Sequence, residues 1–319
     1  MDDFRFKQFI VSHSRSAMRV NTDGVLLAAW TNLPPFKSGS DKDPINTIEN
    51  IESTDSHKNC KTLEILDVGT GAGVITLILA QRLSQLGRDF KITGIDIDRP
   101  SIEDALLNFA ASPWRESLVG EVISLQEYLS KIIVNRRDKN SSSNNIEQDQ
   151  GEFSLIISNP PYFSNSLKAP AQRRSAARHN DTLPLETLIE SASKLLCHNG
   201  KLSLILPVKE GRVAIELADG YSLYLNRLCK IKTTPVKPEK RFMMEFIKRE
   251  RQATIQKNIS DNYPKQSEEE LIIQNSDSTY TNHYCNLVAD YYYKDLRQQK
   301  SDLLRYNPVI IQHRQFIST

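Results

Sequence analysis

From residue 62 onward, short apolar segments alternate with longer segments in which apolar residues recur every three or four positions. The short segments predict buried strands at residues 62–68, 91–96, 121–125, 153–158 and 201–206. The longer segments predict helices at about 74–86, 100–110, 126–135 and 184–197. Such alternation is typical of a doubly wound α/β fold, a mostly parallel sheet with helices on both faces and ligands at the carboxyl ends of the strands.

Two further strands follow the alternating part of the chain. A helix at residues 208–218 precedes strand-like segments at 221–231 and 241–247, which we expect to form a hairpin at the sheet edge. The expected sheet therefore has seven strands. A core domain over residues 61–254 and a C-terminal helix and tail over residues 283–319 complete this interpretation.

Residues 1–36 predict a short N-terminal extension: a strand pair at residues 6–11 and 17–20, then a helix that Thr22 or Asp23 can cap. Three polar stretches interrupt the pattern, and we expect them to be flexible insertions: residues 37–60, 135–151 and 255–282. What remains suits one elaborated α/β domain better than two independent ones.

Composition narrows the class of protein. The 319 residues are 39% hydrophobic and 25% charged with a formal net charge of +2, so overall charge does not indicate a nucleic-acid binder. The cysteines and histidines show no metal-ligand spacing, and we expect no metal and reduced thiols in an intracellular protein. The sequence shows neither a signal peptide nor a membrane span, which favours the cytoplasm.

A glycine-rich turn follows the first core strand. Gly69, Gly71 and Gly73 come directly before a helical segment, and Asp67 precedes them. A strand, a glycine turn and a helix N-terminus let a ligand approach the backbone closely. The dinucleotide fingerprint Gly-x-Gly-x-x-Gly would need glycine where Val74 stands. An acid before the turn suits a cationic ligand end, such as a sulfonium amino acid, better than a pyrophosphate.

The next strand ends in two acids, Asp96 and Asp98. A carboxylate at the tip of the second strand is well placed to accept hydrogen bonds from both ribose hydroxyls of a ligand. Either acid could instead cap the helix that starts near Pro100. We interpret Asp96 as the ribose ligand and Asp98 as the cap.

A stiff loop follows the strand at residues 153–158, with the order Asn159, Pro160, Pro161 and Tyr162. The two prolines fix φ and remove two backbone donors. The carboxamide oxygen of Asn159 and the carbonyl of Pro160 then become acceptors near one point, beside the ring of Tyr162. Two such acceptors suit a planar, weakly nucleophilic amine, either the exocyclic amine of a base or a glutamine amide. The alternative is a loop that only terminates a strand.

The glycine turn, Asp96 and Asn159 all lie at predicted strand ends, so one pocket can include all three. In this order and spacing, residues 67–73, Asp96 and residues 159–162 resemble the class I S-adenosylmethionine-dependent methyltransferases that modify amino nitrogens.

Further stretches narrow the resemblance: residues 4–9, residues 18–27, the Ala-Ala-Ser-Pro-Trp of residues 110–114, and Phe163. With them the chain is similar to the bacterial tRNA1(Val) adenine-N6-methyltransferases, which modify adenine 37 next to the anticodon. The Asn-Pro-Pro-Tyr motif is shared by many amino-methyltransferases, so the expected substrate depends on the N-terminal stretch and on Ser-Pro-Trp.

The resemblance implies a Rossmann-like class I methyltransferase fold, S-adenosylmethionine as the cofactor and tRNA as the partner. It implies a catalytic role for Asn159, Pro160 and Tyr162. The cofactor would lie against Asn159 and against the earlier motif residues, namely Asp67, Gly69, Gly71, Gly73 and Asp96.

Two parts of the cofactor site are less regular. The turn at Asn21, Thr22 and Asp23 is either a helix cap only or a cover over the cofactor's amino-acid end, with Thr22 and Asp23 near its carboxylate and amine. Amino-methyltransferases usually carry an acid after the third strand to contact the adenine amine. In this chain Gln126 or the backbone would have to make that contact, with Glu127 pointing elsewhere.

The expected RNA contacts are local. Between Phe163 and Asn180 the chain carries no acid but several basic residues, of which we assign Lys168, Arg173, Arg174 and Arg178 to phosphates flanking the target base. Phe163 could stack on that base, and Trp114 could stack there or belong to the core. Residues 227–241 and the N-terminal basic residues form two further groups. Each group alone is more often a solvated face than a binding site, but all three near the catalytic loop would favour binding.

Three other functions fit the same motifs. Release-factor methyltransferases modify a glutamine amide with the same Asn-Pro-Pro-Tyr, although the N-terminal extension of this chain looks too short for their usual helical domain. DNA adenine methylation is a second alternative. A third is an RNA-binding protein that keeps the cofactor fold without turnover, against which the intact motifs argue.

Overall fold

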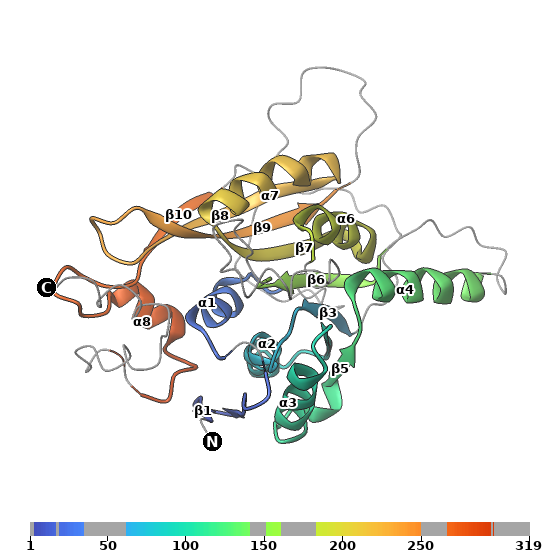
Figure 1. Cartoon of the computed structure of the whole chain (residues 1–319), viewed down its shortest axis with the longest axis horizontal. Helices are drawn as coiled ribbons and strands as arrows, with labels where there is room; N and C mark the ends of the chain where they lie inside the picture. Colours follow the sequence, from blue (N-terminus) through green and yellow to red (C-terminus); the bar gives the residue numbers. More distant parts are fainter. Residues whose placement is uncertain are drawn as a thin grey trace, which may run out of the picture.

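A computed structural model describes residues 3–16, 19–34, 62–140, 151–160, 183–249, 267–294 and 296. Its centre is an eight-stranded sheet with the order β10-β8-β9-β7-β6-β3-β4-β5 (Figure 1). The strands are β3 (Leu63–Val68), β4 (Phe90–Asp96), β5 (Leu118–Val122), β6 (Phe153–Ser158), β7 (Leu196–Pro207), β8 (Leu223–Lys232), β9 (Glu239–Lys248) and β10 (Ser267–Ile272).

The strands from β5 to β7 pair in parallel, as the alternating pattern predicts. Strand β9 is antiparallel to both β7 and β8, so the expected hairpin is present. It does not end the sheet, because β10 adds to β8 in parallel. The class I methyltransferase arrangement is confirmed, while the expectation of seven strands is wrong by this additional edge strand.

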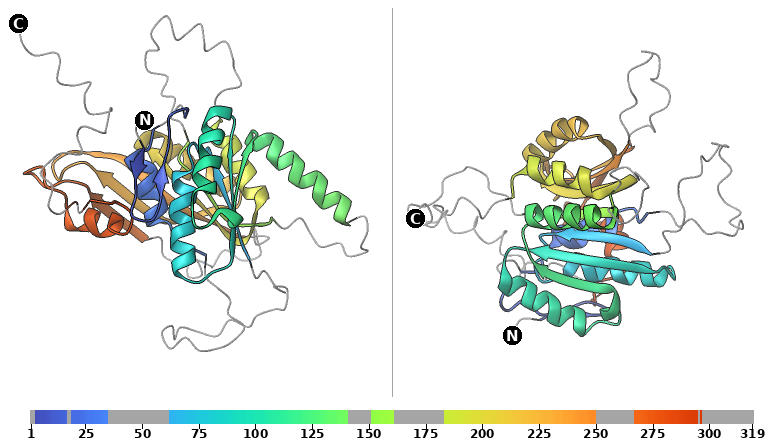
Figure 2. Two further views of the ribbon diagram at one scale, coloured as in Figure 1. Left: turned by 90° about the horizontal axis from the view of Figure 1, so that it is seen from below. Right: turned by 90° about the vertical axis from the view of Figure 1, so that its right-hand side faces the viewer.

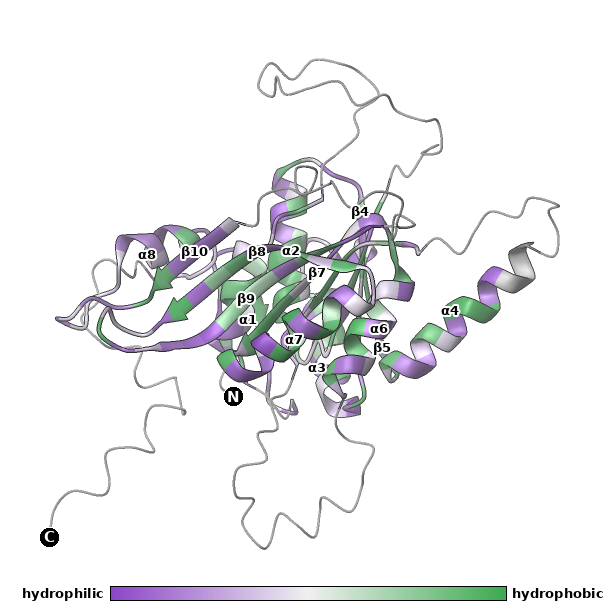
Figure 3. Cartoon of the chain, turned by 90° about the horizontal axis from the view of Figure 1, so that it is seen from above, coloured by the Kyte–Doolittle hydropathy of each residue, from purple (hydrophilic) through white to green (hydrophobic). Residues whose placement is uncertain are grey.

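Strand β10 lies inside residues 255–282, where the sequence predicts a flexible insertion. Its sequence, Ser-Glu-Glu-Glu-Leu-Ile, has no apolar alternation, and Figure 3 shows it as largely hydrophilic. Ion pairs with β8 stabilise it instead: Arg227–Glu269 at 3.0 Å, Lys232–Glu270 at 2.5 Å, and Lys230–Glu268. Charge complementarity across strands fixes a pairing that single-segment hydropathy does not reveal.

Helices cover both faces of the sheet (Figure 2). On one face, α1 (Thr22–Trp30), α2 (Val74–Gln85), α3 (Arg99–Ala110) and α8 (Asn282–Val288) share a core with inward residues such as Ile65 and Ile157. On the other face, α4 (Leu125–Asn140), α6 (Leu185–Leu195) and α7 (Val208–Gly220) pack on residues such as Leu66 and Ile156. Because side chains alternate along each strand, neighbours such as Ile65 and Leu66 serve opposite cores.

The N-terminal extension differs from its prediction. Its strands are β1 (Phe4–Arg5) and β2 (Ile10–Val11), which pair antiparallel, and residues 19–20 are not in a strand. The aromatic residues between them turn inward: Phe6 is 1% exposed, and its ring stacks on Phe9 at 4.6 Å. The apolar pattern predicts one continuous strand over residues 6–11. Because these two rings are buried, the chain turns there instead.

Two boundaries near the third parallel strand also move. Strand β5 ends at Val122, three residues before the expected end, because Ser124 and Glu127 form a capping box that starts α4 at Leu125. Helix α4 then runs to Asn140, into the expected insertion at residues 135–151. Within the described ranges, no helix combines the length and apolar composition that a membrane crossing requires.

Candidate active site at the carboxyl ends of the strands

The ends of β3, β4 and β6 lie side by side, because Val68 pairs with Ile95 on one side and with Ser158 on the other. The backbone N–H of Gly69 donates to the carbonyl of Ile95 at 2.9 Å, and the Ser158 hydroxyl donates to the carbonyl of Val68 at 2.7 Å. The structure therefore brings the glycine turn, Asp96 and Asn159 to one place. We call this place the carboxyl edge.

The glycine turn has left-handed backbone angles that favour glycine, with φ of +72° at Gly69, +57° at Gly71 and +86° at Gly73. Among the described residues, a Cβ added to Gly69 or Gly71 would meet nothing within 4 Å, so there is open space beside the backbone there. A Cβ on Gly73 would lie 2.4 Å from the ring of Phe109, so this glycine also lets α2 and α3 pack closely.

Asp67 supports the turn from inside the protein. Its side chain is fully buried, and one carboxylate oxygen, Oδ2, accepts hydrogen bonds from the hydroxyls of Thr70 and Thr76, both at 2.8 Å. None of the described residues donates to the other oxygen, Oδ1. Burial raises the pKa of this carboxyl to about 6. Thr70 and Thr76, which the motif analysis does not single out, connect the acid to the turn and to the first turn of α2. Contact of Asp67 with a cofactor stays a prediction.

Asp96 lies at the tip of β4. Its carboxylate accepts from the backbone N–H of Gly71 at 3.0 Å and from that of Asp98 at 2.9 Å, and burial raises its pKa. Each carboxylate oxygen has two lone pairs, so these bonds leave capacity for ribose hydroxyls. Asp98 caps α3, since it accepts from the backbone N–H of Ser101 at 3.0 Å. The cap interpretation of Asp98 is confirmed.

Asn159 directly follows β6 and is only 9% exposed. Its Nδ2 lies 3.4 Å from Oδ1 of Asn21, and that oxygen caps α1 by accepting from the backbone N–H of Gly24 at 2.9 Å. Asn21 therefore lies at the carboxyl edge, although no role is assigned to it from sequence. Its place before a helix reveals the cap. No local pattern reveals a contact with a residue 138 positions away.

Thr22 and Asp23 open α1 and contact other parts of the protein. The hydroxyl of Thr22 hydrogen-bonds that of Tyr292, and the Asp23 carboxylate accepts from Nε of Arg241 at 3.0 Å. The turn at residues 21–23 is thus both a helix cap and a neighbour of the carboxyl edge. Cofactor contacts of Thr22 and Asp23 stay predictions.

Gln126 is exposed in the first turn of α4 and does not follow the strand directly. The residue after β5 that touches the carboxyl edge is Ile123, whose backbone N–H donates to the carbonyl of Asp96 at 3.0 Å. Trp114 is 9% exposed and packs edge-on against Phe9, so it belongs to the core.

Pro160 is buried beside Asn159. The rest of the catalytic loop and all assigned RNA contacts lie outside the described residues: Tyr162, Phe163, Lys168, Arg173, Arg174 and Arg178. The basic stretch at residues 227–241 is described, and four of its cations form ion pairs with Asp23, Glu268, Glu269 and Glu270. These pairs favour a structural role for that stretch.

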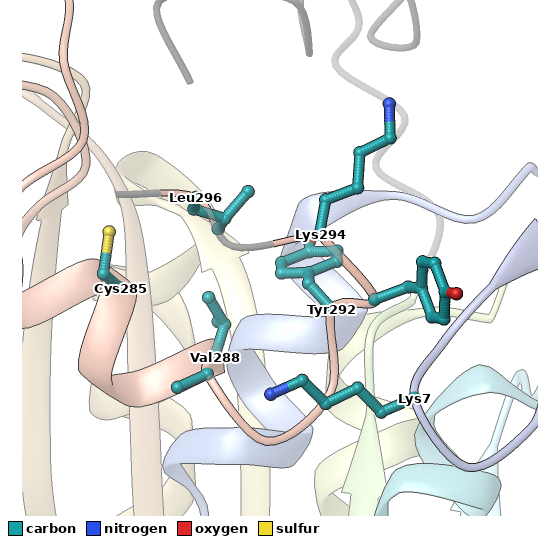
Figure 4. A pocket seen from close by; sticks show the side chains of 8 residues that line it. Lys7, Cys285, Val288, Tyr292, Lys294 and Leu296 are labelled. Atoms are coloured by element: carbon teal, nitrogen blue, oxygen red, sulfur yellow. The ribbon is translucent and has the colours of Figure 1, made fainter. Parts of the chain in front are cut away.

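Among the described residues, neither a metal-binding cluster nor a cavity adds a residue to the carboxyl edge. In the part of the chain that the structure describes, no group of three or more His, Cys, Asp or Glu side chains is arranged to hold a metal ion. A cavity of about 220 Å³ separates Lys7 of the N-terminal hairpin from Val288, Tyr292 and Leu296 near α8 (Figure 4). Its lining includes none of the residues of the carboxyl edge.

Two family models and one solved structure resemble parts of this chain. Residues 59–112 match the family model described as "Methyltransferase domain", and residues 91–212 match that described as "Eco57I restriction-modification methylase". Among solved structures, a predicted O-methyltransferase from Agrobacterium tumefaciens has a TM-score of 0.48 at 17% identity, covering 84% of this chain and 96% of that one.

Curated relatives extend over nearly the whole chain. A protein of Flavobacterium psychrophilum is 33% identical over 91% of this chain and 99% of its own length, and one of Pseudoalteromonas translucida is 35% identical over 92% and 100%. Both carry the name tRNA1(Val) (adenine(37)-N6)-methyltransferase. With this coverage and identity, the chain belongs to the tRNA1(Val) (adenine(37)-N6)-methyltransferase family.

Proposed function

We propose that this protein transfers a methyl group from S-adenosylmethionine to the N6 amine of adenine 37 in tRNA1(Val). The observation that carries the proposal is the relationship to enzymes of that name over 91% of the chain and 99% of the relative. The carboxyl edge adds physical support, because the glycine turn, the carboxylate of Asp96 and the carboxamide of Asn159 lie at adjacent strand ends.

The residues of the carboxyl edge fit the cofactor. The backbone at Gly69 and Gly71 is open to close approach, and Asp96 keeps acceptor capacity for ribose hydroxyls. Oδ1 of buried Asp67, which accepts no hydrogen bond from the described residues, adds negative charge beneath the turn, which favours a cationic ligand end. When bound, S-adenosylmethionine supplies the methyl group of its sulfonium. The sulfur that remains is a neutral thioether.

Asn159 and Pro160 hold the target amine. The oxygen of the Asn159 carboxamide and the Pro160 carbonyl each accept one N6 hydrogen, which favours a pyramidal nitrogen with an available lone pair. The amine then needs no strong base before attack. After the methyl group has been transferred, the cationic nitrogen releases one proton to solvent. Tyr162 would lie against the base as a flat surface.

A tRNA loop suits this arrangement. An unpaired anticodon-loop base leaves its stack at lower cost than a base inside a duplex. Phe163 would stack on the displaced base, and Lys168, Arg173, Arg174 and Arg178 would neutralise nearby phosphates. We place the reaction in the cytoplasm, where tRNA is modified.

One observation supports testing a second substrate. Residues 91–212 match the model of a restriction-modification methylase, so adenine in DNA is the alternative acceptor. Purified protein should be incubated with methyl-labelled cofactor and, separately, a tRNA1(Val) transcript, duplex DNA and a release factor. We expect label in the transcript alone. Label that enters DNA or the release factor at an equal or higher rate would contradict the proposal.

A further inference from the structure

The N-terminus of α1 meets the end of β6 through two asparagines. Oδ1 of Asn21 accepts from the backbone N–H of Gly24 at 2.9 Å and lies 3.4 Å from Nδ2 of Asn159. Resting on the proposed function, we propose that Asn21 is a positioning residue that sets which end of the Asn159 carboxamide is presented to the target amine.

A carboxamide has two ends of similar shape and opposite chemistry. Its oxygen accepts hydrogen bonds and its NH2 group only donates them. The target amine presents N–H groups, so only the oxygen of Asn159 can hold it. In the flipped orientation two donors would face each other. A group that excludes the flip is therefore required beside Asn159.

The helix cap supplies such a group. The first N–H groups of a helix have no partner within the helix, and the N-cap oxygen accepts from one of them. Because Gly24 N–H is a donor, the atom that Asn21 turns toward it must be its oxygen. That same oxygen faces Asn159, so Asn159 must turn its NH2 group toward Asn21. The carboxamide oxygen then occupies the opposite end of the side chain.

Close packing keeps the two asparagines together. A Cβ built on Gly24 would lie 3.5 Å from Ile75, 3.7 Å from Oδ1 of Asn21 and 3.8 Å from Nδ2 of Asn159. The starts of α1 and α2 and the end of β6 thus converge at one point. The neighbours of Asn21 hold this end of α1 in place, Thr22 through Tyr292 and Asp23 through Arg241.

Two substitutions separate the cap from the contact. Asn21→Ser keeps a capping oxygen but is too short to reach Asn159, whereas Asn21→Asp keeps an acceptor for both partners. We expect Asn21→Ser to lower kcat about tenfold with Tm unchanged and with KM for tRNA and Kd for S-adenosylmethionine changed less than about twofold. We expect Asn21→Asp to retain kcat within about threefold of the wild type. A wild-type kcat in Asn21→Ser, or an equal fall in both variants, would overturn the positioning role.

A second measurement does not depend on turnover. In 15N-labelled protein, the side-chain NH2 signal of Asn159 can be assigned by its loss in Asn159→Ala. We expect its hydrogen exchange to be faster in Asn21→Ser than in the wild type and in Asn21→Asp. Equal exchange in all three overturns the inference even if the wild type proves inactive on tRNA. Absence of methyl transfer by the wild type, with protected exchange, would instead contradict only the proposed function.

Discussion

Two fully buried carboxylates on the same sheet show how differently its two halves are built. Glu245 of β9 forms ion pairs with Lys201 at 3.2 Å and Arg227 at 3.9 Å, and it accepts from Nδ2 of Asn226 at 3.0 Å. Among the described residues, Oδ2 of Asp67 at the carboxyl edge accepts from two hydroxyls, and Oδ1 accepts from none. One charge is compensated and the other is only partly so.

Helix α1 connects the two regions, and its two ends differ in the same way. We call its C-terminal end, together with Glu245, Lys201 and Arg227, the anchor region. Nη1 of Arg82 donates to the carbonyls of Ala28 and Thr31 at 2.6 and 2.8 Å. The guanidinium of Arg227 lies 4.2 Å from the ring centre of Trp30.

At the N-terminal end of α1 lie the 3.4 Å contact between Asn21 and Asn159 and the partly exposed pair of Asp23 and Arg241. The interactions that stabilise α1 and the residues proposed for the chemistry thus lie at opposite ends of the helix. Paired charges fix the C-terminal end of α1, and a partly compensated charge and a long contact remain at the carboxyl edge, where we propose that ligands bind.

The largest effect should come from the anchor region. Glu245→Ala removes the carboxylate partner of the largely buried Lys201 and leaves Arg227 with Glu269, and we expect it to lower the free energy of unfolding by about 3–5 kcal/mol. Urea denaturation measures this. The matched control is Glu190→Ala, which removes the exposed pair with Lys194 and should cost about 0.3–0.5 kcal/mol. Similar losses in the two variants would show that the anchor region is not special.

At the carboxyl edge, Asn159→Ala should act on chemistry and not on folding. We expect methyl transfer to fall about 100- to 1000-fold while Kd for S-adenosylmethionine and Tm stay near the wild type. Asn32→Ala is the control, because that exposed side chain lies at the other end of α1. Loss of cofactor binding in Asn159→Ala would remove Asn159 from its role toward the amine.

The buried carboxyl of Asp67 should make the free energy of unfolding depend on pH. Its pKa is about 6 in the folded protein against an ordinary 3.8, so between these values the folded state binds more protons than the unfolded state. Stability contributed by this group therefore falls as pH rises from about 4 to about 6, by about 3 kcal/mol in total.

Asp67→Asn should remove that dependence. The variant should match the wild type in stability near pH 4 and exceed it by up to about 3 kcal/mol at pH 7, with weaker cofactor binding. Urea denaturation at a series of pH values tests this. A difference that does not change with pH would mean that the Asp67 carboxyl does not titrate in this window.

The smallest effect concerns the N-terminal end of α1. Asp23 and Arg241 are about 30% exposed, at 28% and 29%, so their ion pair should contribute about 1 kcal/mol or less. A double-mutant cycle with Asp23→Asn and Arg241→Gln measures the coupling, which should shrink as salt is added. A coupling as large as the loss in Glu245→Ala would erase the contrast between the two ends of the helix.

Sequence predicts the parts of this protein whose signals are local. Strand β6 coincides with its predicted range, because an apolar segment ends at Asn159 and Pro160. The glycine turn and Asp96 lie at the strand ends where the pattern puts them. The cap role of Asp98 follows from a proline in the first turn of the helix.

The missed features depend on partners distant in sequence. Strand β10 forms because Glu268, Glu269 and Glu270 face cations of β8. The contact between Asn21 and Asn159 requires α1 to pack against α2 and β7 before it exists. Gln126 is a local error instead: β5 ends three residues before its predicted end, where Ser124 and Glu127 form a capping box.

The most direct test of the account is single-turnover transfer of labelled methyl from S-adenosylmethionine to a tRNA1(Val) transcript, followed by digestion and mapping of the modified nucleoside. The account predicts one N6-methyladenosine at position 37 and no transfer to a transcript in which guanosine replaces that adenosine. Undiminished transfer to the guanosine transcript would contradict it.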